Sequence, residues 1–390
     1  MGKRAWLLLI GGLVSSIGDR FAAIAYALFA VSVHSPGLLS AVFAAELVPP
    51  LLLGLIGGVV TDKALRRWLW PTVLILQTAC FTAMSQADTS TPWLIVVLVA
   101  VSSSLASLIG PVGTVLLRGL VTDESQHGNA ARWTAVSSGF AGVGGTVAAA
   151  ATFQASATHV LFLVDAASFL ILALLGALAV RNVPLPTSPR SPLRPADAFT
   201  GFPRLTSPAT FGRSGMAMLI GVMFGTSLEG IVGVFFLRNV MHVNPTMYGV
   251  VIGSWSAGML AGPALLRPRT AHTSWRHLMP VSAIAMGICI AVPALAVDQW
   301  TTVVAFTLGG AANGLFNVGI TSAIFQGVPQ HEQGRAWPAF GILAGACALL
   351  GYLTGAAVGA GYARETMLVS GVLPATVGLV ALVRPTKPRG

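Results

Sequence analysis

The most constraining feature of the sequence is its succession of apolar stretches, each about as long as a helix that crosses a bilayer. About 20 predominantly apolar residues in an α-helix span the roughly 30 Å hydrocarbon core of a membrane. Only 9% of the 390 residues are charged, whereas soluble domains carry about 25% charged residues. Because helices satisfy their backbone hydrogen bonds internally, the sequence predicts an all-α polytopic membrane protein.

Twelve spans are predicted, in two groups of six. They are residues 5–33, 38–60, 69–87, 93–117, 130–153, 159–180, 214–237, 246–266, 277–297, 301–324, 337–361 and 366–383. A stretch rich in Pro, Ser and Arg separates the two groups and predicts a cytoplasmic linker. We therefore divide the chain into an N-terminal six-helix half (residues 1–181), the linker (182–213) and a C-terminal six-helix half (214–390).

The positive charges predict the orientation in the membrane. Of the 22 Lys and Arg residues, all but Arg20, Arg238 and Arg364 lie in, or at the edge of, the loops and tails on the side that holds both termini. Such loops face the cytoplasm, so both termini are expected there, in a plasma or inner membrane. Topology thus explains the net charge of +10, and we expect the lipid bilayer, not nucleic acid, as the partner.

Similar motifs recur at a nearly constant separation in the two halves. Residues 118–121 (RGLV) end the fourth span and residues 326–329 (QGVP) end the tenth. Residues 128–130 (GNA) open the fifth span and residues 334–336 (GRA) open the eleventh. This self-similarity predicts two pseudo-symmetric, parallel repeats about an axis along the membrane normal.

The loop after the second span reads GVVTDKALRR, and its residues have physical roles. Gly58 allows two helix ends to approach closely, and Asp62 offers an acceptor to the N–H groups of a helix end. Lys63, Arg66 and Arg67 hold the loop on the cytoplasmic side. An ordinary positively charged loop is the alternative interpretation. The pattern resembles the loop 2–3 signature of the major facilitator superfamily, which implies a conformational latch that helps hold the outward-facing state.

Three further motifs are similar to the macrolide- and siderophore-exporter branch of that superfamily: residues 18–21 (GDRF), 162–169 (FLVDAASF) and 329–335 (PQHEQGR). The resemblance implies a secondary transporter, working as a monomer, that exports amphipathic drug-like, macrolide-like or natural-product molecules by alternating access, with protons as the coupling ion. Residues 102–110 lack the Arg that antiporters of the superfamily often carry in helix 4. Residues 139–145 keep the glycines of their helix 5 signature and lack its Pro.

Four ionisable residues inside the spans are candidates for a substrate and proton site: Asp19, Arg20, Glu46 and Glu229. A charged group at the centre of a membrane helix costs about 2.5–3.5 kcal/mol on insertion scales, so each needs a reason. Asp19 and Glu229 occupy repeat-related positions in the first and seventh spans, which line the central cavity in the superfamily. Glu229 is expected to contribute most to coupling because no Arg adjoins it. The alternative is that Asp19 is neutralised by a neighbour and only orients its helix.

Three more polar residues of the spans can bind substrate or support the structure. Asn313 and Asn317 are four residues apart and so share one helix face. They can hydrogen-bond a substrate or join helices to one another. Asp165, near the outer end of the sixth span, is interpreted as structural.

The sequence offers no basis for an enzyme. It contains no Walker loop, no cluster of His and Cys with metal-ligand spacing, and no defensible Ser–His–Asp set. We therefore expect no cofactor, no metal site and no catalytic residue. The alternative cargoes are a siderophore, a lysolipid or a nutrient on the same fold, and the remote alternative is a membrane enzyme or sensor that does not transport.

Overall fold

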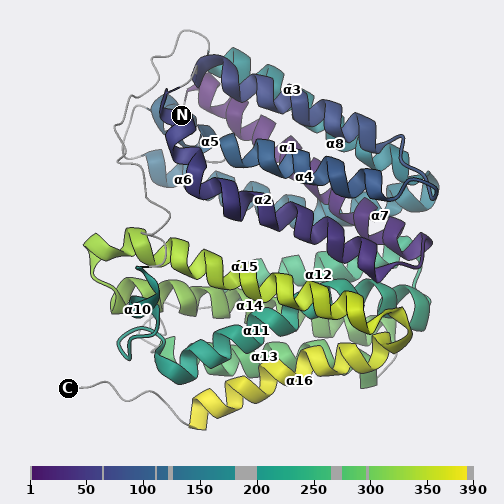
Figure 1. Cartoon of the computed structure of the whole chain (residues 1–390), viewed down its shortest axis with the longest axis vertical. Helices are drawn as coiled ribbons and strands as arrows, with labels where there is room; N and C mark the ends of the chain where they lie inside the picture. The colour runs from purple at the N-terminus through teal and green to yellow at the C-terminus, as the bar shows by residue number, and fades with distance from the viewer. Residues whose placement is uncertain are drawn as a thin grey trace. The chain divides into compact units, whose positions relative to one another are not determined.

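The structure is a computed structural model that describes residues 2–63, 66–109, 112–121, 126–180, 200–264, 275–295 and 298–383 (Figure 1). At residues 53–63, 66–69, 108–109, 112, 114–115, 118, 127–128, 131 and 180 it describes the backbone alone. Within these ranges the regular elements are all helical. The chain folds into two compact units, the first comprising Met1–Val33 with Ala41–Leu193, and the second His34–Ser40 with Arg194–Gly390.

In the first unit the helices run side by side along much of their length (Figure 1). Helix α1 packs against α8, which also packs against α3. The elements from the N-terminus to residue 180 are α1 (Lys3–Ser32), α2 (Pro36–Lys63), α3 (Arg66–Met84), α4 (Trp93–Ile109), α5 (Val112–Leu120), α6 (His127–Phe140), the π-helical turn η2 (Ala141–Gly145), α7 (Thr146–Ala155) and α8 (Thr158–Val180).

In the second unit α12 packs against α14, and α13 packs against both α14 and α16. Its elements are α10 (Phe202–Leu205), α11 (Gly212–Phe235), the π-helical turn η3 (Phe236–Val240), α12 (Pro245–Ala264), α13 (Trp275–Leu295), α14 (Gln299–Gly327), the 3₁₀ turn η4 (Gln330–Glu332), α15 (Gln333–Val358), the 3₁₀ turn η5 (Ala360–Tyr362) and α16 (Ala363–Val383).

Each of the twelve predicted spans coincides with helical structure, and the ends differ by a few residues. The fourth span is divided into α4 and α5, and the fifth runs through α6, η2 and α7. The π-helical turn η2 has the sequence AGVGG, in which glycines ease the wider turn. Eight helical segments of the described chain are long and apolar enough to cross a membrane, and three shorter apolar helices accompany them. The prediction of an all-α polytopic membrane protein is confirmed.

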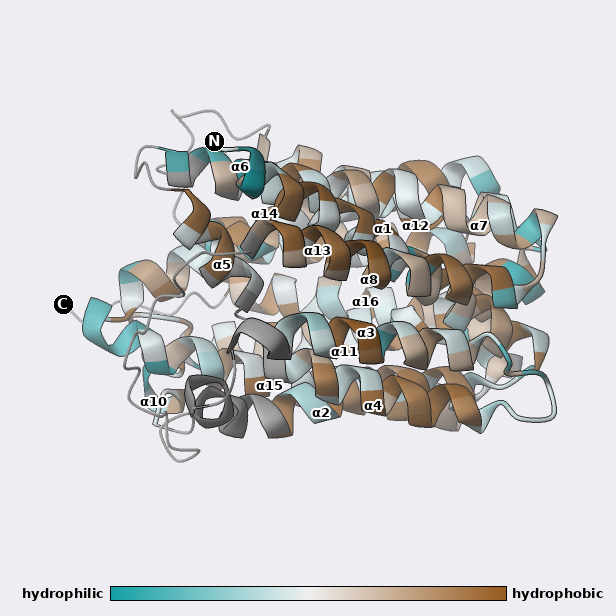
Figure 2. Cartoon of the chain, turned by 90° about the horizontal axis from the view of Figure 1, so that it is seen from above, coloured by the Kyte–Doolittle hydropathy of each residue, from teal (hydrophilic) through white to brown (hydrophobic). Residues whose placement is uncertain are grey.

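Hydropathy follows the same pattern. Apolar residues predominate along α8 and α13, whereas hydrophilic residues gather at α10, at the start of α6 and in the connections between helices (Figure 2). The middle of a membrane helix faces lipid or other helices. Apolar helices joined by hydrophilic connections are therefore typical of a protein that spans a bilayer.

Glycines let the helices of the second unit approach one another closely. A Cβ atom on Gly258 in α12 would overlap the carbonyl oxygen of Thr307 in α14. A Cβ atom on Gly310 in α14 would likewise overlap the carbonyl oxygen of Trp255 in α12. Reciprocal glycines therefore bring the two backbones into contact, as small residues do in membrane helix pairs.

The described part of the predicted linker is attached to the second unit. Arg204 in α10 donates from Nη2 to Oε1 of Glu332 at 2.6 Å. Arg276 at the start of α13 donates from Nη2 to the carbonyl oxygen of Pro208 at 2.8 Å. Residues 182–199 lie outside the described part of the chain, so the predicted limits of the linker and of the two halves stay predictions.

Candidate functional site

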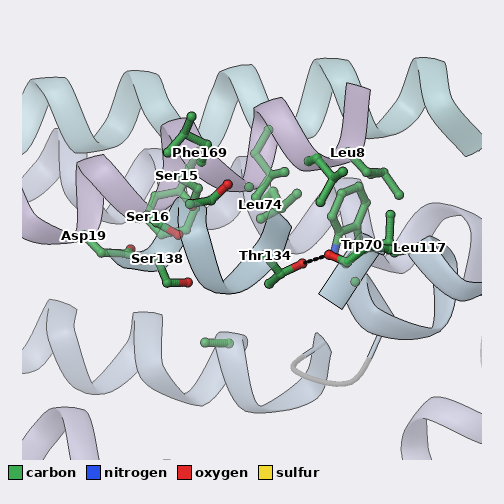
Figure 3. A pocket seen from close by; sticks show the side chains of 18 of the residues that line it. Leu8, Ser15, Ser16, Asp19, Trp70, Leu74, Leu117, Thr134, Ser138 and Phe169 are labelled. Atoms are coloured by element: carbon green, nitrogen blue, oxygen red, sulfur yellow. Dashed lines mark hydrogen bonds between the residues drawn. The ribbon is translucent and has the colours of Figure 1, made fainter. Parts of the chain in front are cut away.

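The first unit contains a cavity of about 930 Å³ (Figure 3). Residues of α1, α3, α4, α5, α6 and α8 line it, so the space lies within one unit. A volume of this size lies within the roughly 300–1,000 Å³ of small-molecule sites in proteins. The cavity is therefore large enough for an organic molecule.

One end of the cavity is polar. Asp19 and Ser138 lie together at that end in Figure 3, with Ser15 and Ser16 beside them. The Asp19 side chain is exposed to this space, whereas Ser15 is buried. A carboxylate and several hydroxyls can bind a cationic or hydrogen-bonding group of a molecule in the cavity.

The rest of the cavity wall is largely apolar. Leu8, Trp70 and Leu117 lie at the end opposite Asp19, Leu74 lies between the two ends, and Phe169 lies near Ser15 (Figure 3). Trp70 is 5% exposed, and its ring fills the place where a side chain on Gly176 in α8 would lie. The arrangement suits an amphipathic molecule, because an apolar body fits the wall while a polar group reaches Asp19.

Arg20 and Glu46 do not line the cavity, but both interact with the carboxyl group at its charged end. Electrostatic interactions link Asp19 to both residues, and they also link Arg20 to Glu46. The aliphatic part of Arg20 packs on Gly145 of η2, where an added Cβ would lie 3.4 Å from its Cβ and Cγ. The structure thus brings three of the four predicted ionisable residues together in one unit. Glu46 lies in α2, which continues as a helix through Pro49 and Pro50.

Glu229, the fourth predicted ionisable residue, belongs to the second unit. It lies in α11, and its Oε1 is directed along the helix to Gly233, on which an added Cβ would be 2.6 Å from that oxygen. The buried Tyr248 of α12 interacts electrostatically with Glu229. The absence of a side chain at Gly233 therefore leaves room for the carboxyl group within the helix packing.

Asn313 and Asn317 contact each other on one face of α14. The Asn317 Nδ2 donates to Oδ1 of Asn313 at 2.9 Å. The predicted shared face is present, and both amides keep further capacity for a substrate.

The predicted latch falls at the junction of α2 and α3. Helix α2 ends at Lys63 and α3 begins at Arg66. Only the backbone is described at Gly58, Asp62, Lys63, Arg66 and Arg67, so their role as a latch stays a prediction.

Residues 8–352, which make up most of the chain, match the family model described as Major Facilitator Superfamily. The chain belongs to this superfamily. No curated protein matches the sequence. The superfamily assignment makes the chain a membrane transporter, so the cavity is a candidate binding site for a transported small molecule.

Solved structures of transporters of this fold are similar to the chain along nearly its whole length. The nucleoside transporter NupG is 13% identical with a TM-score of 0.79, over 98% of this chain and 99% of that chain. A bacterial homologue of the iron transporter ferroportin, in an inward-facing state, is 17% identical with a TM-score of 0.72, over 98% and 99%. The POT family transporter PepTSo is 10% identical with a TM-score of 0.76, over 98% and 97%. At these identities the likeness shows the major facilitator fold alone.

Sequence reasoning missed much of the cavity of this superfamily member. It named no residue of α3 or α6 as a candidate for the substrate site, although Trp70, Gln77 and Thr134 line the space. Gln77 is buried and donates from Nε2 to Oγ of Ser102 at 3.5 Å. The adjacent hydroxyls in two apolar spans, residues 15–16 and 137–138, were the signal that could have indicated it. In the described part of the chain no group of three or more His, Cys, Asp or Glu side chains is placed to hold a metal ion.

Proposed function

We propose that this transporter is a secondary active exporter of amphipathic small molecules, of the drug, macrolide or natural-product kind, driven by the proton gradient. The proposal includes Asp19, Arg20, Glu46, Glu229, Asn313 and Asn317 as the substrate and proton site, with the predicted latch controlling the change of state. A monomer in a plasma or inner membrane suffices, and neither a cofactor nor a metal is required.

The observation that carries the proposal is the cavity of the first unit. Its largely apolar wall ends at one carboxyl group, Asp19, beside several hydroxyls. A carboxylate attracts a cation and loses that attraction when it is protonated. Protons and a cationic cargo therefore compete for Asp19, and this competition is sufficient to couple their movements in alternating access.

Purified protein in liposomes with an imposed pH gradient tests the proposal. We expect a lipophilic cation such as tetraphenylphosphonium to be moved against its own gradient when the proton gradient is present, and movement to stop when an ionophore removes that gradient. Asp19→Asn is expected to weaken binding of the same probe by about tenfold or more, as the loss of one charge-assisted contact does. Asp88→Asn, in an exposed loop, is the matched control.

The alternative cargoes are tested in the same liposomes. Movement of a siderophore, a lysolipid, a nucleoside or a short peptide, without movement of lipophilic cations or macrolides, would replace export of amphipathic molecules by transport of that cargo. Unchanged binding of every probe by Asp19→Asn would remove Asp19 from the site.

The proposed orientation is tested by labelling single cysteines in a variant without Cys80, Cys289 and Cys347. An impermeant thiol reagent applied to intact cells is expected to label Asn244→Cys and to leave Ser188→Cys unlabelled, because the positive charges predict a cytoplasmic linker. Labelling of Ser188→Cys from outside would reverse the proposed topology.

A further inference from the structure

Asp165 is the most deeply buried of the described acidic side chains of the first unit. It lies about two turns into α8, and its side chain has no exposed surface. Its Oδ1 accepts a hydrogen bond from Oγ of Ser168 at 3.0 Å. Its Oδ2 is buried and has no hydrogen-bond partner within the described residues. The sequence interpretation of Asp165 as a structural residue does not account for this oxygen.

Helix α1 packs directly against the Asp165 side chain. A Cβ atom on Gly18 would overlap both Oγ of Ser168 and Oδ1 of Asp165. The Asp165 carboxyl is therefore directed at the backbone of α1 at the residue before Asp19. Asp19 and Asp165 interact electrostatically across this contact, so the charge on either one affects the other.

Several titratable groups surround Asp165, and no cation among the described residues forms an ion pair with it. From α1, Asp19 and the buried Tyr26 interact with it, and Glu46 of α2 acts on both of these. Among the described side chains of the other packed helices, α3 brings Cys80 and α7 brings no titratable group, while α8 itself also carries His159 near its start.

Arg20 is the nearby cation, and it already interacts with Asp19 and Glu46. An ionised carboxylate with no surface exposure and one unpaired oxygen is strongly unfavourable, because nothing replaces its lost hydration. The neutral acid avoids that cost, and the second carboxyl nearby makes two negative charges at this place less favourable still.

We propose that Asp165 carries a proton and forms, with Asp19, a pair of carboxyl groups that stores protons inside the first unit. Asp19 faces the cavity and exchanges with cargo, whereas Asp165 lies behind it, shielded by α1. The role of the pair in coupling rests on the proposed proton-driven transport, but the protonation of Asp165 does not.

The chemistry is proton transfer alone. When a cationic cargo leaves Asp19, that carboxylate gains a proton from water, so one O–H bond forms there. When cargo returns, the Asp19 O–H bond breaks and the proton goes back to water. Asp165 keeps its own O–H bond while Asp19 is charged, since two adjacent carboxylates without separate cations are disfavoured.

Infrared spectroscopy of the whole purified protein in lipid tests the proposal without any cargo. At neutral pH we expect the carbonyl band of a protonated carboxylic acid, and we expect Asp165→Asn to lose the part of it that belongs to this residue. Asp19→Asn is expected to keep the Asp165 band and to shift its frequency and its pH titration. The exposed Asp88→Asn is the control and should change neither.

A spectrum of folded Asp165→Asn equal to that of the parent would overturn the proposal. If Asp165→Asn does not fold, the parent labelled with ¹³C at the aspartate carboxyls keeps the test sharp, because a protonated aspartate must then show a shifted band. Loss of that band on adding a divalent cation such as Mn²⁺ at constant pH would mean that the pair binds metal instead. Absence of gradient-driven transport with the band intact would contradict only the proposed function.

Discussion

The two units of the molecule place the ionisable residues of their spans differently. In the first unit α1, α2 and α8 gather Asp19, Arg20, Glu46 and Asp165 near a cavity. In the described part of the second unit, Glu229 lies on a helix that packs on α15 and α16 through glycines. The first unit therefore groups its ionisable residues beside a cavity, whereas the second unit holds Glu229 within close helix packing.

The two units also differ in the size of the side chains between their helices, and this size decides whether a cavity remains. In the first unit Trp70 projects onto Gly176 of α8, and bulky side chains border the cavity. In the second unit glycines face backbone atoms of the next helix at Gly258, Gly310 and Gly287. Close backbone contact fixes helices relative to one another, so the second unit is expected to tolerate fewer side-chain changes and the first to tolerate more at its cavity.

The largest expected effect is a test of this packing difference. Gly258→Leu places a side chain on the carbonyl oxygen of Thr307, and overpacking of this kind should destabilise the second unit by about 3 kcal/mol or more. Gly230→Leu is the matched control on α11, where an added Cβ meets nothing within 4 Å. Thermal unfolding of both purified variants is the measurement, and equal melting temperatures would show that close backbone contact does not fix the second unit.

The next effect separates the carboxyl groups of the two units. Glu229→Gln is expected to abolish transport driven by a pH gradient and to retain downhill exchange of cargo, because the amide fits the same space and cannot release a proton. Liposome assays with and without the gradient give both rates. If Glu229→Gln pumps as well as the parent, coupling belongs to the first unit alone, at Asp19 or Glu46.

A smaller effect concerns the loop that follows the second span in each unit. The first unit has Asp62 after its second span, whereas the second unit has residues 262–267 (GPALLR) at the related place, without an acid. Asp62→Asn is expected to slow transport strongly and to leave the equilibrium affinity for cargo within a few-fold. Binding and transport by the same preparation check this, and a collapse of affinity in folded protein would assign Asp62 to the substrate site.

The smallest effect compares two loop acids that precede repeat-related helices. Hydrogen bonds from Ser90 and Thr91 lower the pKa of Asp88. The bond from the Thr301 N–H, at 2.7 Å, is foremost in lowering the pKa of Asp298, which caps α14. Since these pKa values are lowered in the folded chain, the stabilisation exists at neutral pH and is lost as pH falls below about 4.

Asp298→Ala should therefore lower the melting temperature by about 2 °C or less at pH 7, with the difference disappearing in acid. Asp88→Ala should do less, because Asp88 orders a turn before α4 and does not cap the helix itself. A larger loss for Asp88→Ala would reverse this order.

The sequence was sufficient for the fold because each span signals itself by length and composition. It also indicated Asp19, Arg20 and Glu46, since a charge in an apolar run is conspicuous, and the structure brings these three together. Trp70, Thr134 and Phe169 could not be found that way. A Trp, a Thr or a Phe in a membrane helix is ordinary, and only packing decides whether it faces a cavity, lipid or another helix.

For Asp165 the sequence showed the charge in the span but could not show what surrounds the side chain. Its position near the end of a span suggested a structural role, because depth along a helix was the only information available. Asp165 is distinguished by its contacts at the side of α8, where Gly18 on α1 and Ser168 on α8 itself enclose its carboxyl group. Such enclosure depends on the rotation of two helices about their axes, which periodicity constrains weakly in chains that are apolar on all sides.

Gly11 and Gly18 have a mechanical consequence. They stand about two turns apart on α1, and both face α8: an added Cβ on Gly11 would lie 3.0 Å from Cδ1 of Leu172, and one on Gly18 would overlap Ser168. Two points of contact prevent one rod from sliding or rolling on another. We therefore expect α1 and α8 to move as one rigid pair during a transport cycle, with Gly18 of α1 packed over the Asp165 carboxyl throughout it.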